Sequence, residues 1–179
     1  MPGIYLASKS PRRKEILESL EVDYKVLNYP HDESSPANSE SAFEFIERNT
    51  KEKSLSAFAY LQENEMQILP ILTADTLVSL DDRIFGKPDN KDHAISMLLE
   101  LSGQYHSVIS CVAIGVLDKT KSDTVNFNID IVETKVLFKT LTAYECKKYW
   151  ETKEPIDKAG SYGIQAVSYT HLRAHETSQ

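Results

Sequence analysis

The start of the chain carries a dense group of cationic side chains. Four of the seven residues at positions 8–14 are Lys or Arg, and Pro11 follows Ser10 at a predicted helix start. Cations are mildly unfavourable at a helix N-terminus, whereas the free backbone N–H groups and the helix dipole favour an anion there. Arginine adds a planar set of donors that matches phosphate oxygens. The segment therefore predicts phosphate binding, and the alternative is a solvent-exposed basic turn.

Asp75 stands in the middle of an otherwise apolar run, residues 68–80. A carboxylate inside an apolar strand costs on the order of several kcal/mol unless it is paired, hydrogen-bonded or bound to a metal. If the strand ends at Ala74, Asp75 lies at the mouth of the strand, where α/β proteins usually bind ligands. The alternative is a strand-end aspartate that caps a turn.

Three further charged residues are candidates for the same chemistry. Lys53 lies on the apolar face of a predicted helix, where a lysine either reaches a ligand or extends along the edge of the apolar face to water. Lys87, between a glycine and a proline, is either a ligand contact or a surface turn residue. Glu33 is a candidate metal ligand because magnesium takes one or two carboxylates beside substrate phosphates, although most acidic loops are simply solvated.

The composition excludes several classes of protein. The chain has 179 residues, of which 41% are hydrophobic and 26% charged, so a disordered or fibrous protein is not expected. Its formal net charge of −7 argues against a protein that coats nucleic acid or anionic membrane. No apolar run approaches the roughly 18 residues of a transmembrane helix. Cys111 and Cys146 form neither a zinc signature nor a disulfide framework, which favours a cytoplasmic protein.

Periodicity and turn signals predict the elements that must position these residues. The expected elements are a strand at 4–7, a helix from 11 to 20, a loop at 28–41, a helix over 43–61, a strand at 68–80 with a hairpin return at 84–85, a helix over 94–101, strands at 105–117 and 124–138, and a helix from 142 to 150. The last residues, 166–179, show no clear periodicity and are expected to form a disordered or foreign tail.

Four stretches resemble, in order, the motifs of the Maf family of nucleoside-triphosphate pyrophosphatases, also called septum-formation inhibitors. They are LASKSPRRKEIL at 6–17, LTADTLVSLDDRIFGKP at 72–88, AISMLLELSGQYHSV at 94–108 and EPIDKAGSYGIQ at 154–165. The resemblance implies an α/β fold with a mixed sheet and two lobes around a central cleft, similar to inosine-triphosphate pyrophosphatases. It also implies hydrolysis of a nucleoside triphosphate to the monophosphate and pyrophosphate with Mg²⁺ or Mn²⁺.

The resemblance implies roles for the residues that match the family motifs. The proton acceptor is Asp75, which shares the metal with Glu33; the catalytic lysines are Lys53 and Lys87; the phosphate-binding residues are Ser8 and Arg13, with the helix start at Ser10; further candidates are Asp157 and Lys158. Three positions that separate pyrimidine-preferring members read Arg12, Thr76 and Gln165, which resembles the dTTP/UTP pyrophosphatase branch rather than the branch acting on 7-methyl-GTP.

The end of the chain departs from the family pattern. Family members continue after the IQ dipeptide with a glycine and a closing segment, whereas here residues 166–179 follow a Maf-like domain at 1–165. This predicts a truncation that costs stability or activity. Three readings stay open: an enzyme that removes non-standard or excess nucleotides, an inactive family member, and a non-catalytic nucleotide-binding regulator of cell division. The expected partners are a nucleoside triphosphate and a second copy of the chain, with no nucleic acid and no membrane.

Overall fold

The computed structural model describes residues 3–32, 34–81, 83–118, 120, 124–163 and, for the backbone alone, 173–178. Its elements are β1 (Ile4–Leu6), α1 (Pro11–Ser19), β2 (Tyr24–Val26), α2 (Ala42–Glu63), β3 (Ile71–Leu80), β4 (Arg83–Phe85), α3 (Lys91–Leu101), β5 (Tyr105–Asp118), β6 (Thr124–Phe138), α4 (Ala143–Glu151), the 3₁₀ turn η1 (Ala159–Ser161) and β7 (Arg173–Ser178).

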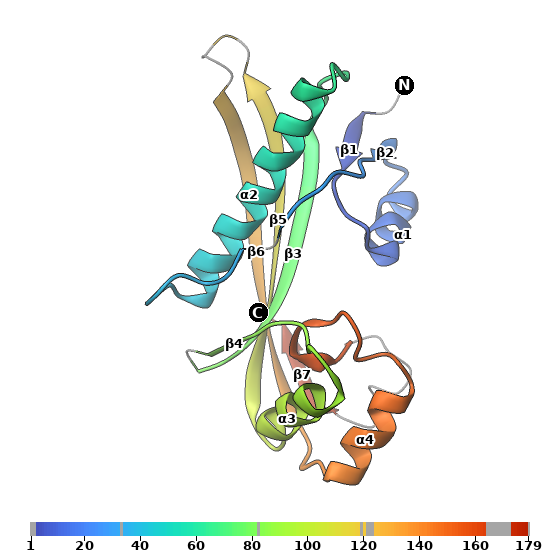
Figure 1. Ribbon diagram of the computed structural model, residues 1–179, viewed down its shortest axis with the longest axis vertical. Coiled ribbons are helices and arrows are strands. Elements are labelled where there is room, and N and C mark those ends of the chain that lie inside the picture. Colours follow the sequence, from blue (N-terminus) through green and yellow to red (C-terminus); the bar gives the residue numbers. More distant parts are fainter. Residues whose placement is uncertain are drawn as a thin grey trace. The chain divides into compact units, whose positions relative to one another are not determined.

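The described strands form one mixed sheet in the order β2-β1-β3-β5-β6-β7, with β4 pairing to β3 (Figure 1). β1 pairs in parallel with β2 and β3, whereas the β3–β4 and β6–β7 pairs are antiparallel. The chain divides into two compact units, Met1–Asp75 with Cys111–Ile131 (unit 1) and Thr76–Ser110 with Val132–Gln179 (unit 2). The mixed sheet and the two units confirm the expected α/β class.

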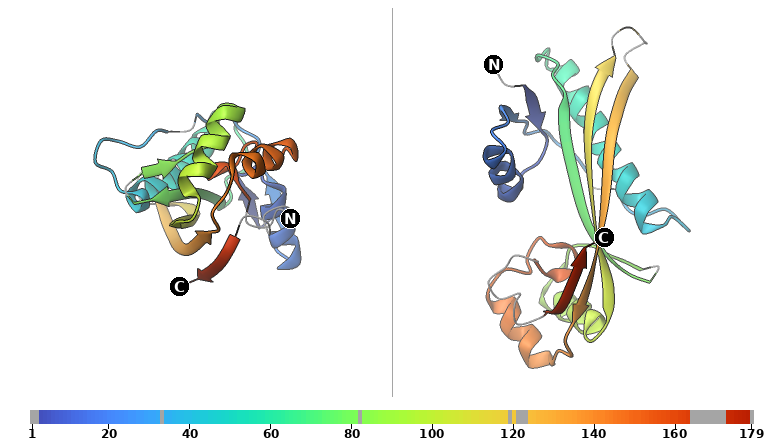
Figure 2. Two further views of the ribbon diagram at one scale, coloured as in Figure 1. Left: turned by 90° about the horizontal axis from the view of Figure 1, so that it is seen from below. Right: turned by 180° about the vertical axis from the view of Figure 1, so that it is seen from behind.

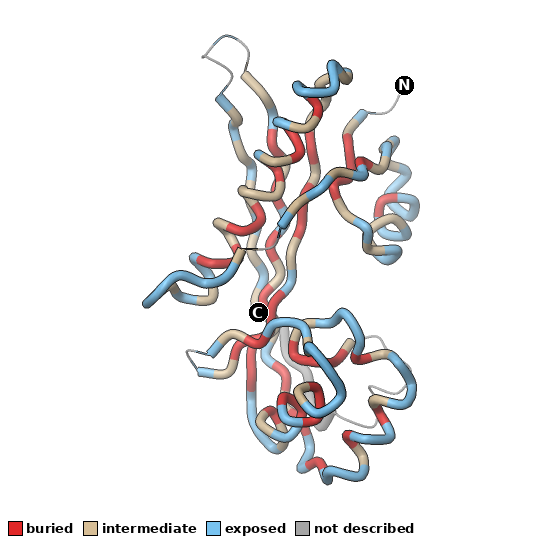
Figure 3. The backbone as a smooth tube through the Cα atoms, in the orientation of Figure 1, coloured by how far each residue is buried: buried red, intermediate tan, exposed pale blue. Residues whose placement is uncertain are grey.

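In unit 1, the long helix α2 runs alongside strands β3, β5 and β6 (Figures 1 and 2). A capping box starts the helix: the Ser41 side chain accepts from the Glu44 N–H, and the Glu44 carboxylate accepts from the Ser41 N–H. Buried positions then recur along α2 every three or four residues (Figure 3). They are Phe45, Ile46, Asn49, Thr50, Ser54, Ala57, Phe58 and Leu61.

Gly115 on β5 allows α2 to pack closely on the sheet. A Cβ atom at this position would lie 2.6 Å from Ser54 Oγ and 3.0 Å from the Phe58 ring, which is closer than side chains tolerate. The same face of the helix buries Ala57 and Leu61 against Ile71 at the start of β3. This packing sets the distance between α2 and the strand that carries Asp75.

The predicted elements agree with the structure apart from their ends. α1 begins at Pro11 after Ser10, and the predicted Thr142–Glu145 capping box starts α4. β3 starts at Ile71 rather than at residue 68, because Pro70 has no N–H to donate to a neighbouring strand. α3 starts at Lys91 rather than at residue 94, because the Asn90 side chain caps the helix by accepting from the His93 N–H.

Unit 2 has its own apolar core, in which His106 is 2% exposed. The ring Nε2 lies 2.7 Å from the Tyr162 hydroxyl, and the ring packs edge-on against Phe138 with the ring centroids 4.7 Å apart. Burial lowers the pKa of His106 to about 4. The histidine is therefore a neutral structural residue in the folded protein at pH 7.

The low pKa of His106 makes the stability of the protein sensitive to acid. In the unfolded chain the imidazole takes up a proton near pH 6.5, whereas in the folded protein it does so only near pH 4. The neutral imidazole therefore contributes fully to the free energy of unfolding above pH 6.5, and this contribution is lost as the pH falls toward 4. The loss amounts to about 2–3 kcal/mol at pH 4.5. We expect His106→Gln to reduce the difference in unfolding free energy between pH 7 and pH 4.5 by that amount. Urea unfolding at the two pH values measures this difference for the original protein and for the variant. The same difference in both proteins would contradict the prediction.

Part of the segment expected to be a tail is paired in the sheet. Arg173–Ser178 forms β7, which pairs antiparallel with β6 in a register that places Ser178 opposite Thr134. For these six residues the structure differs from the expected disorder, because an edge strand pairs through its backbone and needs no apolar periodicity. The foreign origin of residues 166–179 stays a prediction. Among the helices of the described residues, none has the length and apolar character needed to span a membrane.

Candidate active site

Asp75 lies on β3 and is the last residue of the first segment of unit 1. Side chains of α2 donate hydrogen bonds to its carboxylate. Its Oδ2 atom accepts one hydrogen bond from Lys53 Nζ at 2.7 Å and another from Asn49 Nδ2 at 2.5 Å. The side chains of Lys53 and Asp75 are 13% and 24% exposed, so water reaches the pair only in part. The buried-strand carboxylate expected from the sequence is thus paired and hydrogen-bonded.

The two donors lie one helical turn apart on α2 and project from the same face toward β3. Two further bonds hold this part of the helix in place. The Thr73 hydroxyl on β3 donates to the Thr50 carbonyl at 3.2 Å, and the Tyr29 hydroxyl donates to the Lys53 carbonyl at 2.8 Å. The helix therefore holds both donors at a fixed height along the strand.

Arg13 on α1 reaches the same part of β3, near the middle of the strand. Its Nη1 donates to Ser8 Oγ at 2.9 Å and to the Ala74 carbonyl at 2.7 Å, one residue before Asp75. Burial lowers the pKa of Arg13, and the negative charge of Asp75 opposes that shift. Arginine stays charged under such a shift, so a partly buried cation lies within electrostatic reach of the carboxylate.

The loop before α1 completes this group of residues. The Ser10 N–H donates to Ser8 Oγ at 3.3 Å, and Ser10 is the N-cap residue of α1 although its own side chain makes no capping bond. Arg12, the next residue but one, is exposed. The structure thus brings together Ser8, Ser10, Arg13, Lys53 and Asp75, as expected if they bind one polyanion.

The other predicted residues belong to unit 2 or fall outside the described part of the chain. Thr76 and Lys87 belong to unit 2 and are exposed; Thr76 Oγ1 lies 3.2 Å from Ser110 Oγ. Asp157, with a φ of 63°, and Lys158 are exposed residues of the turn before η1 in unit 2. Glu33 and Gln165 lie outside the described residues.

Asn49 is a site residue that was not predicted from the sequence. It is 4% exposed and contacts the Asp75 carboxylate directly. The usable signal was its spacing, because a polar residue four positions before Lys53 on a helix shares the face of that lysine. Asparagine at a buried helical position is unfavourable on propensity alone, which points to a specific contact.

The site has the charges needed to bind a highly charged anion and to move a proton. Arg13 and Lys53 are cations that reach neighbouring residues of β3, and the N-terminus of α1 adds backbone N–H groups. The Asp75 carboxylate has the chemistry of a general base. Such a set of residues suits phosphoryl transfer to water, in which positioning and charge do most of the work.

The donor set also fits a divalent metal held partly by substrate. Within the described residues there is no group of three or more Asp, Glu, His or Cys side chains placed to hold a metal by themselves. Mg²⁺ and Mn²⁺ sites of nucleotide enzymes need only one or two carboxylates, because phosphate oxygens and water supply the other ligands. Asp75 meets that requirement.

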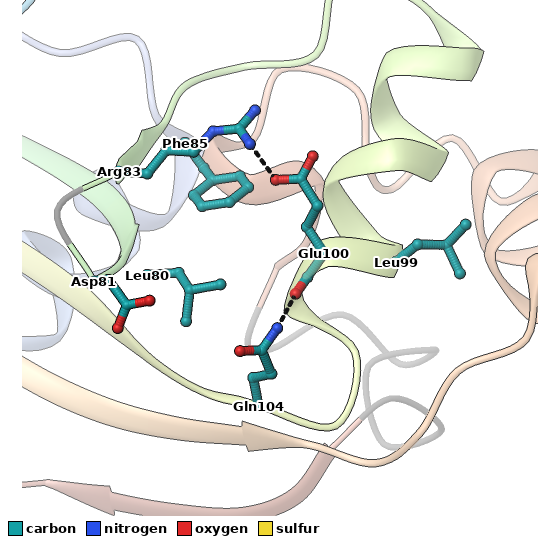
Figure 4. A pocket seen from close by; sticks show the side chains of 7 residues that line it. All are labelled: Leu80, Asp81, Arg83, Phe85, Leu99, Glu100 and Gln104. Atoms are coloured by element: carbon teal, nitrogen blue, oxygen red, sulfur yellow. Dashed lines mark hydrogen bonds and ion pairs between the residues drawn. The ribbon is translucent and has the colours of Figure 1, made fainter.

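A separate pocket lies in unit 2 (Figure 4). It is lined by Leu80, Asp81, Arg83, Phe85, Leu99, Glu100 and Gln104. Arg83 forms an ion pair with Glu100, and the Gln104 amide donates to the Glu100 carbonyl at 2.7 Å. Of the described residues predicted to carry chemistry, none lines this pocket.

Comparison with known proteins gives a family and relatives for the whole chain. Residues 3–178 match the family described as Maf-like protein, and this range includes most of the segment expected to be a tail. The chain is 39% identical to the dTTP/UTP pyrophosphatase of Aliivibrio fischeri over 90% of its own length and 81% of the relative. It is 37% identical to the dTTP/UTP pyrophosphatase of Yersinia pestis over 97% of its length and 82% of the relative.

Solved structures with a similar arrangement are more distant. The Ham1 protein of Staphylococcus aureus is 13% identical with a TM-score of 0.48, over 95% of this chain and 90% of that one. A nucleoside-triphosphatase (dITP/XTP pyrophosphatase) from Mycobacterium abscessus is 15% identical with a TM-score of 0.44, over 75% of this chain and 73% of that one.

Proposed function

Because the chain belongs to the Maf-like protein family, we propose that it is a nucleoside-triphosphate pyrophosphatase that acts on dTTP and UTP. The products are the nucleoside monophosphate and pyrophosphate. The observation that carries the proposal is the Asp75 carboxylate, which accepts from Lys53 on α2 and lies within electrostatic reach of the partly buried guanidinium of Arg13. An acid near two cations suits a reaction in which water attacks a polyanion.

The residues of unit 1 divide the work of this reaction. Arg13, Ser8 and the start of α1 bind phosphate oxygens, and Lys53 offsets negative charge near Asp75. A water oxygen attacks the α-phosphorus, and the bond from that phosphorus to the oxygen bridging to the β-phosphate breaks. Asp75 takes the proton of the attacking water, and pyrophosphate leaves with the bridging oxygen.

A divalent cation, Mg²⁺ or Mn²⁺, fits beside Asp75 together with the phosphates, and Glu33 is the second carboxylate proposed for it. When bound, the metal supplies positive charge on the phosphate oxygens and acidifies a bound water. Lys87 is proposed as a second cation for the departing pyrophosphate.

The remaining roles are proposals about recognition. Arg12, Thr76 and Gln165 are proposed to read the pyrimidine base, because a polar side chain that a bound nucleotide covers, and that the wrong base leaves unpaired, discriminates strongly. Asp157 and Lys158 are further candidates for substrate contact. A homodimer and a cytoplasmic location stay predictions.

One experiment tests the proposed function. The purified protein is incubated with Mg²⁺ or Mn²⁺ and a panel of canonical and modified triphosphates, and the products are identified by chromatography. Monophosphate plus pyrophosphate from dTTP and UTP supports the proposal. Diphosphate plus phosphate would overturn the site of cleavage. Nucleotide binding without any turnover would favour a regulator or an inactive family member.

A further inference from the structure

The two ends of the Asn49 side-chain amide differ in their hydrogen bonding. Its Nδ2 atom lies 2.5 Å from Oδ2 of Asp75, the same oxygen that accepts from Lys53 Nζ at 2.7 Å. An ionised carboxylate offers acceptors alone, so the NH₂ end of the amide must face Asp75. This contact therefore determines the orientation of the amide group.

The other end of the same amide is buried without a donor. Asn49 is 4% exposed, and within the described part of the chain its Oδ1 atom makes no hydrogen bond. A buried acceptor without a partner destabilises the folded protein. An apolar residue of similar shape at this position would avoid that penalty, so the favourable contribution of Asn49 is made at Asp75.

We propose that Asn49 is a positioning residue for Asp75 in the proposed hydrolysis, a role that rests on the proposed function. Lys53 alone does not fix the carboxylate plane, because an ammonium group on a flexible four-carbon chain follows its acceptor. Asn49 is short, buried and one helical turn from Lys53, so its N–H direction is set by the backbone of α2. Two donors from one helix on one oxygen therefore fix how Asp75 faces the attacking water.

The test compares variants that keep the shape of Asn49 and remove its donor. In Asn49→Leu we expect kcat for dTTP to fall about tenfold or more, because a small misplacement of a catalytic group is costly, while KM changes less than about threefold. The midpoint of thermal unfolding should stay the same or rise, because the unpaired acceptor is gone. Asn49→Val also lacks the donor and adds no charge beside Asp75, so it should lower kcat as well, and it serves if the leucine variant fails to fold.

Ser54→Ala is the matched control. Ser54 lies on α2, is fully buried, and its hydroxyl also has no hydrogen-bond partner among the described residues, so unlike Asn49 it is not bonded to Asp75. Its removal should also keep or raise the unfolding midpoint, and it should leave kcat unchanged. The pair of variants therefore separates relief of an unpaired polar group from loss of positioning at Asp75.

A second measurement separates failure of this inference from failure of the proposed function. The ¹³C signal of the Asp75 carboxylate should move in Asn49→Leu and stay in place in Ser54→Ala, whether or not the enzyme turns over. Wild-type kcat in a folded Asn49→Leu protein, or an unmoved ¹³C signal, would overturn the inference and leave the proposed function intact. No turnover by the unaltered protein would overturn the proposed function, and with it the catalytic role of Asn49.

Discussion

Replacement of Asp75 by asparagine is expected to lower kcat for dTTP and UTP by about 10³-fold, the middle of the range that a positioned general base contributes. The substitution keeps the shape of the side chain and removes both its charge and its ability to accept a proton. Lys53 and Arg13 stay in place, so the triphosphate still has its cations. We therefore expect nucleotide binding, measured by calorimetry, to remain detectable when turnover is lost.

Asp130→Asn is the control for the loss of one negative charge. Asp130 is an exposed residue of β6 in unit 1 and lies outside the site described for Asp75. Its replacement should leave kcat within about twofold of the original, because the field of an exposed charge is screened by solvent and salt. A folded Asp75→Asn protein with unchanged turnover would rule out Asp75 as the base.

Replacement of Arg13 by lysine has the second large expected effect, although the charge is kept. A lysine carries its three donors on one nitrogen, so it cannot hold Ser8 Oγ and the Ala74 carbonyl with one nitrogen and direct a separate nitrogen at a phosphate, as the planar fork of arginine can. We expect KM for dTTP to rise about tenfold or more, the loss of roughly one charge-assisted bond. We also expect the unfolding free energy to fall by about 1–3 kcal/mol, because the Ala74 carbonyl loses its arginine donor. Initial rates and urea unfolding measure the two effects.

Lys14→Ala is the companion variant, since it removes a cation from the next position of α1. Lys14 is partly exposed and is not one of the site residues, so KM should change less than about threefold. If Arg13→Lys kept both the original KM and the original stability, Arg13 would neither bind phosphate nor stabilise the protein through its hydrogen bond to β3.

Local patterns predicted the elements of this fold well, because each has a local physical cause. Pro11 after Ser10 and the Thr142–Glu145 capping box are signals contained within one helical turn, and both helices begin where these signals place them. The starts of β3 and α3 differ from the predicted ones, and both differences also have a local cause. Pro70 has no N–H to donate, and the Asn90 side chain caps α3.

The contacts of the site were harder to predict than its members. Asp75 and Lys53 stand out in the sequence because each is a charge in an apolar pattern, but the sequence offers alternatives for both. Their pairing joins residues 22 positions apart, and the bond from Arg13 to the Ala74 carbonyl joins residues 61 apart. Such contacts depend on how α1 and α2 pack on β3, and helical or strand periodicity contains no information about that packing.

The link between Arg13 and β3 also bears on how the protein opens. β1 is three residues long, and its described register with β3 pairs just Tyr5 with Ile71 and Leu6 with Leu72. So short a ladder is expected to separate from the rest at a free-energy cost below that of global unfolding. The N-terminal segment, which carries Arg13, would then open locally while the rest of the protein stays folded. A bound triphosphate that contacts both this segment and α2 would suppress this local opening. It would therefore slow hydrogen exchange at the amides of Tyr5 and Ala7.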